Sequence, residues 1–332
     1  MLWSRKPVSI GLIGCGAMGE IHAHAIARHG GARLRCVFDP DRARAADLVR
    51  KHHGVRLAES LENVLADRDV EAVLIATPHN LHKPQTLAAL QAGKHVLVEK
   101  PTALNHADAC EMTEAARRYG LRLLVGQVMR FWPNVARARE AIAAGRIGDV
   151  RQVIRRRMMR QKDAGRAWAY DRKQAGGWII QGNACHEVDA VLYMLDGQVA
   201  RVEALATRNN PKWNDIDELA VLLALESGAI CSLSQSLNCW PDGIDTVIIG
   251  TDATITLSEV RRGFAIDTDT TILGASDGFG EQIHDFVAAV REGTPSRIDA
   301  GNILETMRTL DRISEQLAEP EPCTQRAVHA LA

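Results

Sequence analysis

Residues 8–125 alternate between short apolar runs and longer amphipathic segments, and this alternation constrains the fold more than any other feature. The apolar runs are nearly continuous, which is typical of parallel strands covered on both faces. Strands are predicted at residues 8–13, 34–38, 72–76, 96–98 and 123–125. Helices are predicted between them at residues 17–29, 42–52, 84–91 and 106–119. Such a series of β–α–β units predicts a doubly wound parallel sheet.

The pattern changes after Gly126. A helix is predicted at residues 130–144, and longer strand-like runs follow with few helices between them. These runs lie at residues 150–159, 199–208, 219–225, 229–237, 246–249 and 254–257, with helices at 183–195, 282–291 and 303–317. Strands without intervening helices predict a largely antiparallel sheet. We therefore expect an α/β domain over residues 1–126 and an α+β domain over 127–332, with the last helix free to pack back on the first domain.

Composition sets the broad class of the protein. The 332 residues carry a formal net charge of −1, so no overall field favours nucleic acid or an anionic membrane. No apolar stretch approaches the roughly 20 residues that cross a bilayer. The seven cysteines show neither a CxxC pair nor a metal-ligand spacing, and they are expected to be free thiols of a reducing compartment. We expect a cytoplasmic protein with no metal site, no nucleic-acid partner and no membrane partner.

A glycine-rich turn follows the first predicted strand and opens the first predicted helix. The run Gly14-Cys15-Gly16-Ala17-Met18-Gly19 fits GxGxxG, and in this context it indicates the turn of a dinucleotide-binding Rossmann domain. Gly14 permits the tight turn, Gly16 lets the pyrophosphate approach the backbone, and Gly19 lets the helix pack on the strand.

Asp39 lies 20 residues after Gly19, at the end of the second predicted strand. Its carboxylate can accept hydrogen bonds from the adenosine ribose hydroxyls, and it would repel a 2′-phosphate. This favours NAD over NADP as the cofactor. Arg42 keeps NADP open, because a guanidinium at that position could cover a 2′-phosphate.

Two further segments lie at the ends of predicted strands, where an open α/β sheet holds its ligand. Thr77-Pro78-His79 is expected to run under the ribose and the nicotinamide, and His82 either joins it or caps the next helix. Lys100 follows the strand at 96–98 within Glu99-Lys100-Pro101, where it can touch both the nicotinamide and the substrate.

With these motifs the chain resembles the Gfo/Idh/MocA family, the relatives of glucose-fructose oxidoreductase and inositol dehydrogenase. The glycine turn, Asp39, Thr77-Pro78-x-x-x-His82, the run from Ala92 to Pro101, and Gly176-Gly177 followed by His186-x-x-Asp189 carry the resemblance over nearly the whole chain. It implies an NAD(P)-dependent oxidoreductase whose second domain is an open mixed sheet that forms dimers or tetramers. The expected cofactor contacts are Gly14, Cys15, Gly16, Ala17, Met18, Gly19, Asp39, Arg42, Thr77, Pro78, His79, His82, Glu99, Lys100, Gln127 and Arg130.

The resemblance also implies the reacting residues. Lys100 looks like the family's active-site lysine, His186 like its catalytic histidine, and Asp189 like the aspartate one helical turn further on. Arg130 resembles an arginine at the domain junction. Gly182 departs from the pattern, because inositol-dehydrogenase-like members have an aspartate there. The string around His186 looks more like members that oxidise carboxylated ring-cleavage semialdehydes or aromatic dihydrodiols.

A chemical role follows for the two main residues. His186 is the predicted base, because the ordinary imidazole pKa of about 6.5 suits proton abstraction near neutral pH. Lys100 is expected to hydrogen-bond the same oxygen, to stabilise a developing alkoxide and to disfavour imidazolium. The reverse assignment, with lysine as the base, stays open, and so does a helix-capping role for Asp189. The predicted substrate contacts are Lys100, Trp168, Asn183 and His186.

An arginine cluster and three aromatic residues have open assignments. Arg155, Arg156, Arg157 and Arg160 lie on or beside one predicted strand, with Arg155 and Arg157 on the same face. That face either binds a substrate carboxylate or is solvated or part of a subunit interface, and the second interpretation is favoured. Trp168 and Tyr170 either wall the substrate pocket or cover the domain seam, and Trp178 is expected in the core.

The favoured function is NAD-dependent oxidation of a secondary alcohol of a sugar, cyclitol or related polyhydroxy compound. The alternatives are a dehydrogenase of a carboxylated dihydrodiol or semialdehyde hemiacetal, an NAD-retaining glycosidase or lyase, and a non-catalytic nucleotide sensor. The presence of both Lys100 and His186 argues against the sensor, which needs neither.

Overall fold

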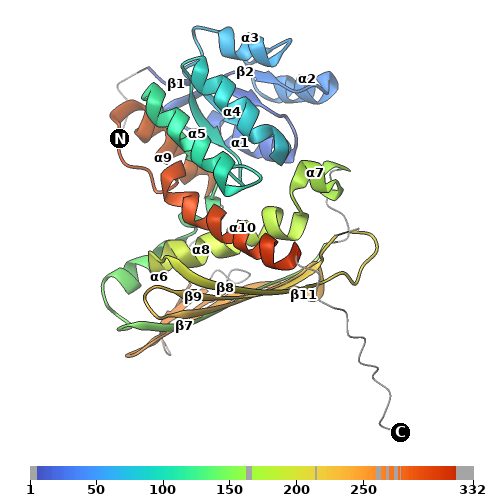
Figure 1. The fold of residues 1–332 in the computed structure, drawn as a ribbon. Coiled ribbons are helices and arrows are strands. Elements are labelled where there is room, and N and C mark those ends of the chain that lie inside the picture. The colour runs from blue at the N-terminus through green and yellow to red at the C-terminus, as the bar shows by residue number, and fades with distance from the viewer. Residues whose placement is uncertain are drawn as a thin grey trace.

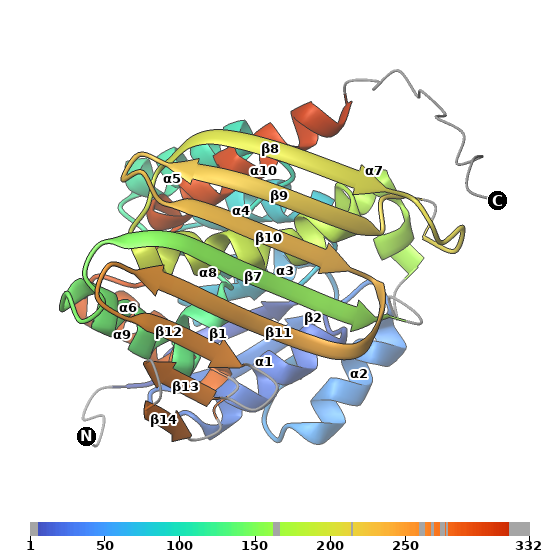
Figure 2. The ribbon, with the colours of Figure 1, turned by 90° about the horizontal axis from the view of Figure 1, so that it is seen from below.

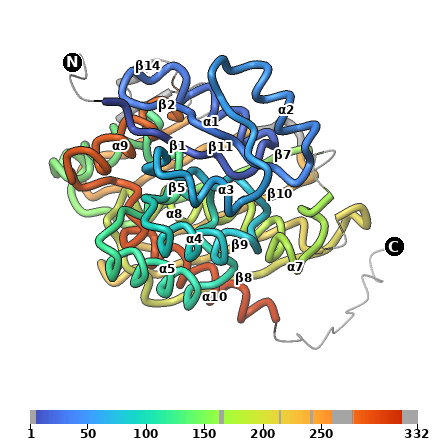
Figure 3. The backbone as a smooth tube through the Cα atoms, turned by 90° about the horizontal axis from the view of Figure 1, so that it is seen from above, coloured from blue at the N-terminus to red at the C-terminus, as the bar shows by residue number. Residues whose placement is uncertain are grey.

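The chain forms two parts that lie one above the other, and each part contains one β-sheet with its helices (Figure 1). The computed structural model describes residues 6–161, 167–213, 215–258, 263–266, 269–272, 276 and 278–318. Seen from above, the first part of the chain lies over the second (Figure 3). Within the described residues, every helix is too short or too polar to cross a membrane.

The first sheet has six parallel strands in the order β3-β2-β1-β4-β5-β6, which confirms the doubly wound prediction. Its strands are β1 Val8–Ile13, β2 Ala32–Phe38, β3 Arg56–Leu57, β4 Ala72–Ile75, β5 His95–Val98 and β6 Leu123–Val125. Its helices are α1 Ala17–Arg28, α2 Arg42–Lys51, α3 Leu61–Ala66, α4 His82–Gln91 and α5 His106–Tyr119. The strand order reverses beside β1, and this switch point is where such sheets bind ligands.

Local signals explain why most of these bounds were predictable. Helix α5 has the predicted bounds because Asn105 caps its first turn and Gly120 ends it with a φ of 65°. The short strand β3 and helix α3 were not predicted. A two-residue strand carries too little hydrophobic periodicity to be recognised, although Ser60 caps α3 through the backbone nitrogen of Asn63.

The second sheet has eight strands in the order β14-β13-β12-β11-β7-β10-β9-β8. Its strands are β7 Val150–Arg160, β8 Val199–Thr207, β9 Glu218–Leu225, β10 Ile230–Ser236, β11 Asn238–Gly250, β12 Thr254–Ser258, β13 Gly263–Ile266 and β14 Asp269–Ile272. Strands β7 and β10 run parallel and the other neighbours antiparallel, so the sheet is mixed and mostly antiparallel, as predicted. Strands β13 and β14 were not predicted.

In the described part of the chain, helices cover one face of this sheet and leave the other open. The helices after β6 are α6 Pro133–Ala143, α7 Arg172–Ala175, α8 Cys185–Leu195, α9 Phe279–Glu292 and α10 Leu304–Ala318. Helix α8 packs on β7 and β10, and α10 packs on β8. The opposite face lies toward the viewer in Figure 2, and it carries exposed apolar side chains. These exposed side chains include Ile154, Leu205, Leu222 and Ile230.

Two predicted helices have a turn of another helix type at their starts. The helix predicted at 130–144 is a 3₁₀ turn, Val128–Phe131, followed by α6. The break occurs because Pro133 disfavours a helical conformation at Trp132, whose φ and ψ of −67° and 131° are extended. The helix predicted at 183–195 begins earlier, as the π-helical turn Trp178–Ala184 that continues into α8.

The last two helices tie the second part of the chain to the first. Helix α9 packs on α1 and β1, so it extends the first domain although it follows β14 in the chain. Helix α10 packs on α5 and α8, and Asp311 accepts a hydrogen bond from the backbone nitrogen of His106 at 2.9 Å. Helix α10 therefore lies against a helix of the first part of the chain, and α9 makes a second such contact that was not predicted.

Candidate functional site

A cavity of about 1080 Å³ opens where the carboxyl ends of the first sheet face the inner side of the second. Its lining includes residues that follow five strands of the first sheet, among them Gly14, Asp39, Thr77, Lys100 and Gly126. The remaining lining comes mainly from β7, the 3₁₀ turn Ala167–Tyr170, and the segment that leads into α8. The cavity therefore joins the predicted cofactor turn to the predicted reacting residues.

The glycine turn has the geometry that a dinucleotide requires. Gly14 has a φ of 94°, and a Cβ there would lie 2.5 Å from the Ala76 carbonyl oxygen. A Cβ on Gly19 would lie 2.1 Å from the Gly14 carbonyl oxygen, so only glycine permits this close packing. Gly16 begins α1 with no side-chain cap and with open space around its Cα. The uncapped amino end of α1 thus fits a pyrophosphate.

Asp39 is tied to this turn from the end of β2. Its Oδ2 accepts a 2.8 Å hydrogen bond from the Cys15 backbone nitrogen, and its Oδ1 accepts one of 2.8 Å from Asp41. The carboxylate is buried and lines the cavity. Arg44 lines the cavity beside it, whereas the predicted Arg42 lies outside that lining. Both arginines lie in the first turn of α2, and their sequence positions did not distinguish them.

The loop after β4 divides into residues that line the cavity and one that fastens the loop. Thr77, Pro78 and His79 line the cavity, and the Thr77 hydroxyl donates to Gln85 Oε1 at 2.7 Å. His82 is buried at the start of α4, where its ring nitrogens lie 2.7 Å from the Pro101 carbonyl oxygen and 3.0 Å from that of Thr77. His82 therefore lies outside the lining of this cavity and does not cap α4, and its ring instead connects the loop to the segment after Lys100.

Glu99 and Lys100 leave β5 in different directions. Glu99 is buried with His22, whose Nε2 lies 2.6 Å from Glu99 Oε1. Burial would raise the pKa of Glu99, but the adjacent His22 and Lys100 lower it overall. Lys100 lines the cavity, and its Nζ donates to the Gly182 carbonyl oxygen at 2.7 Å. The lysine therefore reaches from the first sheet to the segment before α8.

His186 lies in the first turn of α8 and lines the same cavity as Lys100. Its Nδ1 is buried and has no hydrogen-bond partner among the described residues. Burial lowers its pKa well below the ordinary value, and the charges of Lys100, Arg157 and Arg155 lower it further. A histidine in this environment is neutral near pH 7 and can accept a proton. Asn183, a predicted substrate contact, also lines the cavity.

Asp189 and Arg130 form a buried ion pair away from this cavity. Arg130 Nε donates to Asp189 Oδ2 at 2.9 Å, and Arg130 Nη2 donates to Oδ1 at 2.6 Å. Thr306 Oγ1 donates to the same carboxylate at 3.1 Å. Arg130 also donates to the carbonyl oxygens of Arg297 and Asn302. The pair thus connects the 3₁₀ turn after β6, helix α8 and helix α10.

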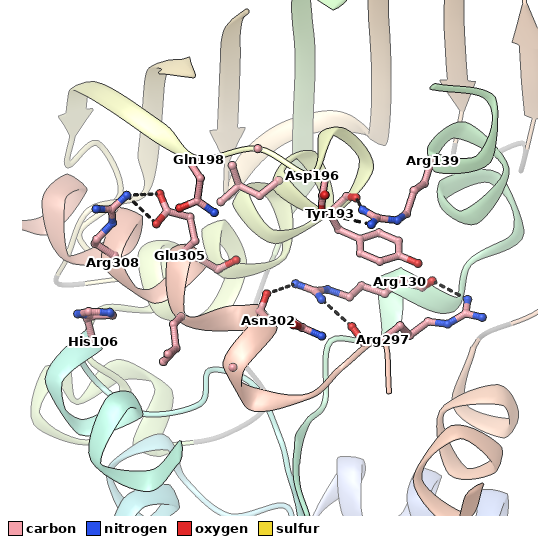
Figure 4. A pocket seen from close by; sticks show the side chains of 15 residues that line it. His106, Arg130, Arg139, Tyr193, Asp196, Gln198, Arg297, Asn302, Glu305 and Arg308 are labelled. Carbon is pink, nitrogen blue, oxygen red and sulfur yellow. Dashed lines mark hydrogen bonds and ion pairs between the residues drawn. The ribbon is translucent and has the colours of Figure 1, made fainter. Parts of the chain in front are cut away.

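Arg130 lines a second cavity of about 690 Å³ at the carboxyl end of α8 (Figure 4). The close-up shows Arg130 pointing toward Asn302, with Tyr193 and Arg139 beside it. The guanidinium groups of Arg130 and Arg139 lie 4.9 and 4.6 Å from the Tyr193 ring centre.

Gln127, another predicted cofactor contact, is buried and donates to the Cys185 carbonyl oxygen at 3.4 Å.

The favoured interpretation of the arginine cluster is wrong for Arg155 and Arg157. Both lie on the inner face of β7, where Arg155 is buried and Arg157 lines the cavity. They donate to the buried Glu187 of α8 at 2.5 and 2.7 Å. Arg156 lies on the open face and pairs with Asp245 at 2.7 Å. Arg155 and Arg157 face inward because α8, which is distant in sequence, covers that face of β7.

Three ring side chains, His79, Trp168 and Trp178, form a wall of the cavity. The His79 ring lies 4.7 Å from the Trp168 ring and 6.1 Å from the Trp178 ring. Trp178 is nearly buried, as predicted, but it also lines the cavity and donates to Gln161 Oε1 at 3.2 Å. Tyr170 stacks on Trp213 outside the cavity lining.

Other chemistry is limited within the described residues. No group of three or more His, Cys, Asp or Glu side chains there could hold a metal ion. The six cysteines in that part of the chain are free, and Cys323 lies outside the described residues. Burial raises the pKa of Cys15 and Cys231 to about 12 and that of Cys185 to about 11. These three thiols are unreactive near neutral pH.

Comparison with known proteins agrees with this geometry. A family model described as an oxidoreductase family with an NAD-binding Rossmann fold matches residues 8–127, and the model of the GFO/IDH/MocA C-terminal domain matches residues 135–256. A 4-carboxy-2-hydroxymuconate-6-semialdehyde dehydrogenase from a Sphingobium species is 28% identical, with 93% of this chain and 98% of that protein covered. The scyllo-inositol 2-dehydrogenase (NAD(+)) of Bacillus subtilis is 30% identical over 86% of this chain and 82% of its own length.

A solved structure is similar to this chain over the whole fold. The crystal structure of GenD2 from gentamicin A biosynthesis in complex with NAD superimposes with a TM-score of 0.86 at 25% identity, covering 95% of both chains. The glycine turn, the sheet order and these matches agree over both parts of the molecule. The chain therefore belongs to the Gfo/Idh/MocA family of NAD-binding oxidoreductases.

Proposed function

We propose that the protein is an NAD-dependent dehydrogenase that oxidises a secondary alcohol of a sugar, cyclitol or related polyhydroxy compound. The single observation that carries the proposal is that Lys100 and His186 share one cavity with the uncapped glycine turn. The dehydrogenases among the relatives support the reaction class, since one is named for a cyclitol and another for a carboxylated semialdehyde. Residues 1–126 would bind the cofactor and residues 127–332 would shape the substrate pocket.

The cofactor would be held by residues that fit it. The pyrophosphate would lie on the amino end of α1 at Gly14 and Gly16, and the adenosine ribose would lie against Asp39. Asp39 accepts hydrogen bonds from two backbone nitrogens and stays on the cavity wall, where it disfavours a 2′-phosphate. Bound NAD would accept a hydride from the substrate carbon.

The chain's own residues would handle the proton and the oxygen. His186 would take the hydroxyl proton on its ring, because its lowered pKa keeps the imidazole neutral near pH 7. Lys100 would donate a hydrogen bond to the same oxygen as negative charge develops on it. Its existing hydrogen bond to the Gly182 carbonyl oxygen keeps the ammonium at the entrance to α8. Asp189 would hold α8 through Arg130 rather than touch the substrate.

The assembly and the compartment belong to the same proposal. The open face of the second sheet carries Ile154, Leu205, Leu222 and Ile230 exposed, which supports a homodimer or homotetramer formed through that face. Four of the described cysteines are buried and all six are free, which supports a reducing, cytoplasmic compartment.

The test is NADH formation, followed by absorbance, with NAD and a panel of sugars, cyclitols and their acid derivatives. Growth of the NADH signal with one class identifies a dehydrogenase and its substrate type. Tight NAD binding with no NADH formation anywhere would contradict the proposal, and it would favour an enzyme that retains its cofactor or a nucleotide sensor.

A further inference from the structure

The inner face of β7 directs two arginines toward α8, and one of them reaches the cavity. Arg155 is fully buried, where its Nε donates to Glu187 Oε2 and its Nη1 to Thr246 Oγ1, each at 2.5 Å. Arg157 lies two residues further along, on the same face of the strand. It keeps 16% of its side-chain surface exposed and lines the cavity together with His186.

Two neighbours fix the Arg157 guanidinium. Its Nη1 donates to Glu187 Oε1 at 2.7 Å, and its Nε lies 3.2 Å from Met159 Sδ. Among the residues that the structure describes, none accepts a hydrogen bond from Nη2. A planar guanidinium that is already oriented loses little side-chain entropy on binding, and it matches the geometry of a carboxylate.

Cationic side chains gather around this end of the cavity. Arg155 and Arg157 both donate to the carboxylate of Glu187. Lys100 is a further cation, and its Nζ contacts Gly182 only four residues before His186. The two carboxylates among the described lining residues, Asp39 and Glu99, are bonded to the glycine turn and to His22. An anionic substrate group would therefore meet both the Arg157 guanidinium and the Lys100 ammonium, which line the same cavity.

Residue 182, at the same end of the cavity, is a glycine, so it offers no side-chain acceptor to a neutral polyol. A Cβ on Gly182 would lie 2.9 Å from Cδ2 and Cε3 of Trp178, so the Trp178 ring occupies the space of any side chain there. The rings of Trp168 and Trp178 leave a mainly aromatic wall on this side. The local chemistry suits a substrate that combines a compact carbon skeleton with a negative charge.

We propose that this end of the cavity is an anion subsite, in which Arg157 binds a carboxylate carried by the substrate. The inference rests on the proposed dehydrogenase function and narrows its substrate to a hydroxy acid or polyhydroxy acid. Arg157 is the specificity-determining residue. Glu187 is a positioning residue, because it holds Arg157 and lies next to His186 without lining the cavity.

The test compares acids with their uncharged methyl esters on the full chain loaded with NADH. D-glucuronate, D-galacturonate and shikimate are each titrated against their methyl esters, and binding is followed by calorimetry. In parallel, NADH formation from NAD is measured with the same six compounds. The ester keeps the carbon skeleton and removes only the charge, so the acid-to-ester affinity ratio reports the subsite directly.

Arg157→Gln is compared with Arg156→Gln, a matched control on the open face of the same strand. For at least one pair, the native protein is expected to bind the acid about 10- to 100-fold more tightly than the ester, the usual contribution of hydrogen bonds to a charged group. Arg157→Gln should bring this ratio close to one, and Arg156→Gln should leave it unchanged. Since Arg157→Gln leaves Glu187 with one partner, the double variant Arg157→Gln/Glu187→Gln provides a second, charge-balanced comparison.

The outcomes separate this inference from the proposed function. Binding of no acid, equal binding of acid and ester, or an equal loss of both in Arg157→Gln would overturn the anion subsite. NADH formation without any preference for acids would keep the dehydrogenase and remove the subsite. Selective binding of acids without NADH formation would keep the subsite and count against the dehydrogenase.

Discussion

The Nζ of Lys100 donates a 2.7 Å hydrogen bond to the carbonyl oxygen of Gly182. Lys100 follows β5 of the first sheet, and Gly182 lies in the π-helical turn that leads into α8, so the bond joins the two halves of the candidate site. The bond also places a fixed positive charge near His186, where it contributes to the lowered imidazole pKa. One lysine thus links the two halves of the site and adds to the effect of burial on the pKa of the proposed base.

Substituting Lys100 should affect turnover far more than cofactor binding. Lys100→Met removes the proposed donor to the reacting oxygen, and losing one such donor typically lowers kcat by about 100- to 1000-fold. The Kd for NAD should change little, because the glycine turn and Asp39 are untouched. Steady-state kinetics and NAD titration measure the two effects, with the exposed Lys51→Met as the control. Near-normal turnover in Lys100→Met would remove the lysine from the mechanism.

The pH dependence should report His186. Because burial and nearby cations hold its pKa well below 6.5, the neutral base persists to lower pH than a free histidine, and kcat/KM should fall only as the pH drops through that lowered pKa. Lys100→Met should move this acid limb to higher pH, since one of the lowering charges is gone. His186→Asn should abolish the limb. An unchanged limb in His186→Asn would assign proton transfer to another group.

The same pKa shift has a consequence for stability. The pKa of an unfolded histidine is about 6.5, whereas the pKa of folded His186 is lower, so folded His186 stays neutral to lower pH. Its contribution is therefore fully present above the unfolded pKa, and it is lost as the pH falls from there through the folded pKa. Urea unfolding of the native protein between neutral and acidic pH should show a loss of stability that is smaller in His186→Asn. Identical pH slopes for both proteins would contradict a shifted His186.

Gly182→Asp should destabilise the protein rather than restore an inositol-type site. The new side chain would overlap the Trp178 ring, and overpacking of this kind typically costs about 1–3 kcal/mol. In a Trp178→Ala background, Gly182→Asp should cost less free energy of unfolding than it does in the native protein, because the overlap with the ring disappears. Urea unfolding measures the change, and Gly280→Ala is the control, since a Cβ there meets nothing within 4 Å. Full stability in Gly182→Asp would mean that the ring moves freely.

Breaking the buried Arg130–Asp189 pair should destabilise the interface between α8 and α10. Arg130→Met leaves Asp189 buried without its partner, which typically costs about 3–5 kcal/mol. Arg156→Met, which breaks the exposed pair with Asp245, should cost less than about 1 kcal/mol. The free energy of unfolding in urea distinguishes them. If Asp189→Asn instead leaves stability intact and lowers kcat, Asp189 has a direct catalytic role.

Much of the fold was predictable because its signals are local. Strands β1 and β6 and helix α5 have the predicted bounds, and the glycine turn was identified from its place between β1 and α1. Continuous apolar runs, capping side chains and glycines with left-handed φ act within a few residues of chain. Such patterns determine the type and order of elements. Pro133 is a local signal of the same kind, because it starts α6 and separates it from the 3₁₀ turn within the segment predicted as one helix at 130–144.

The tertiary structure decided the remainder, since contacts distant in sequence are involved. Sequence alone determined that Arg155 and Arg157 share a face of one strand, but only the packing of α8 decided that this face looks inward onto Glu187. The packing of α9 on α1 and β1 likewise joins elements that are far apart in the sequence. The sequence determined the elements and the candidate chemistry. The structure decided which charges meet, because burial and pairing arise only when separate elements pack together.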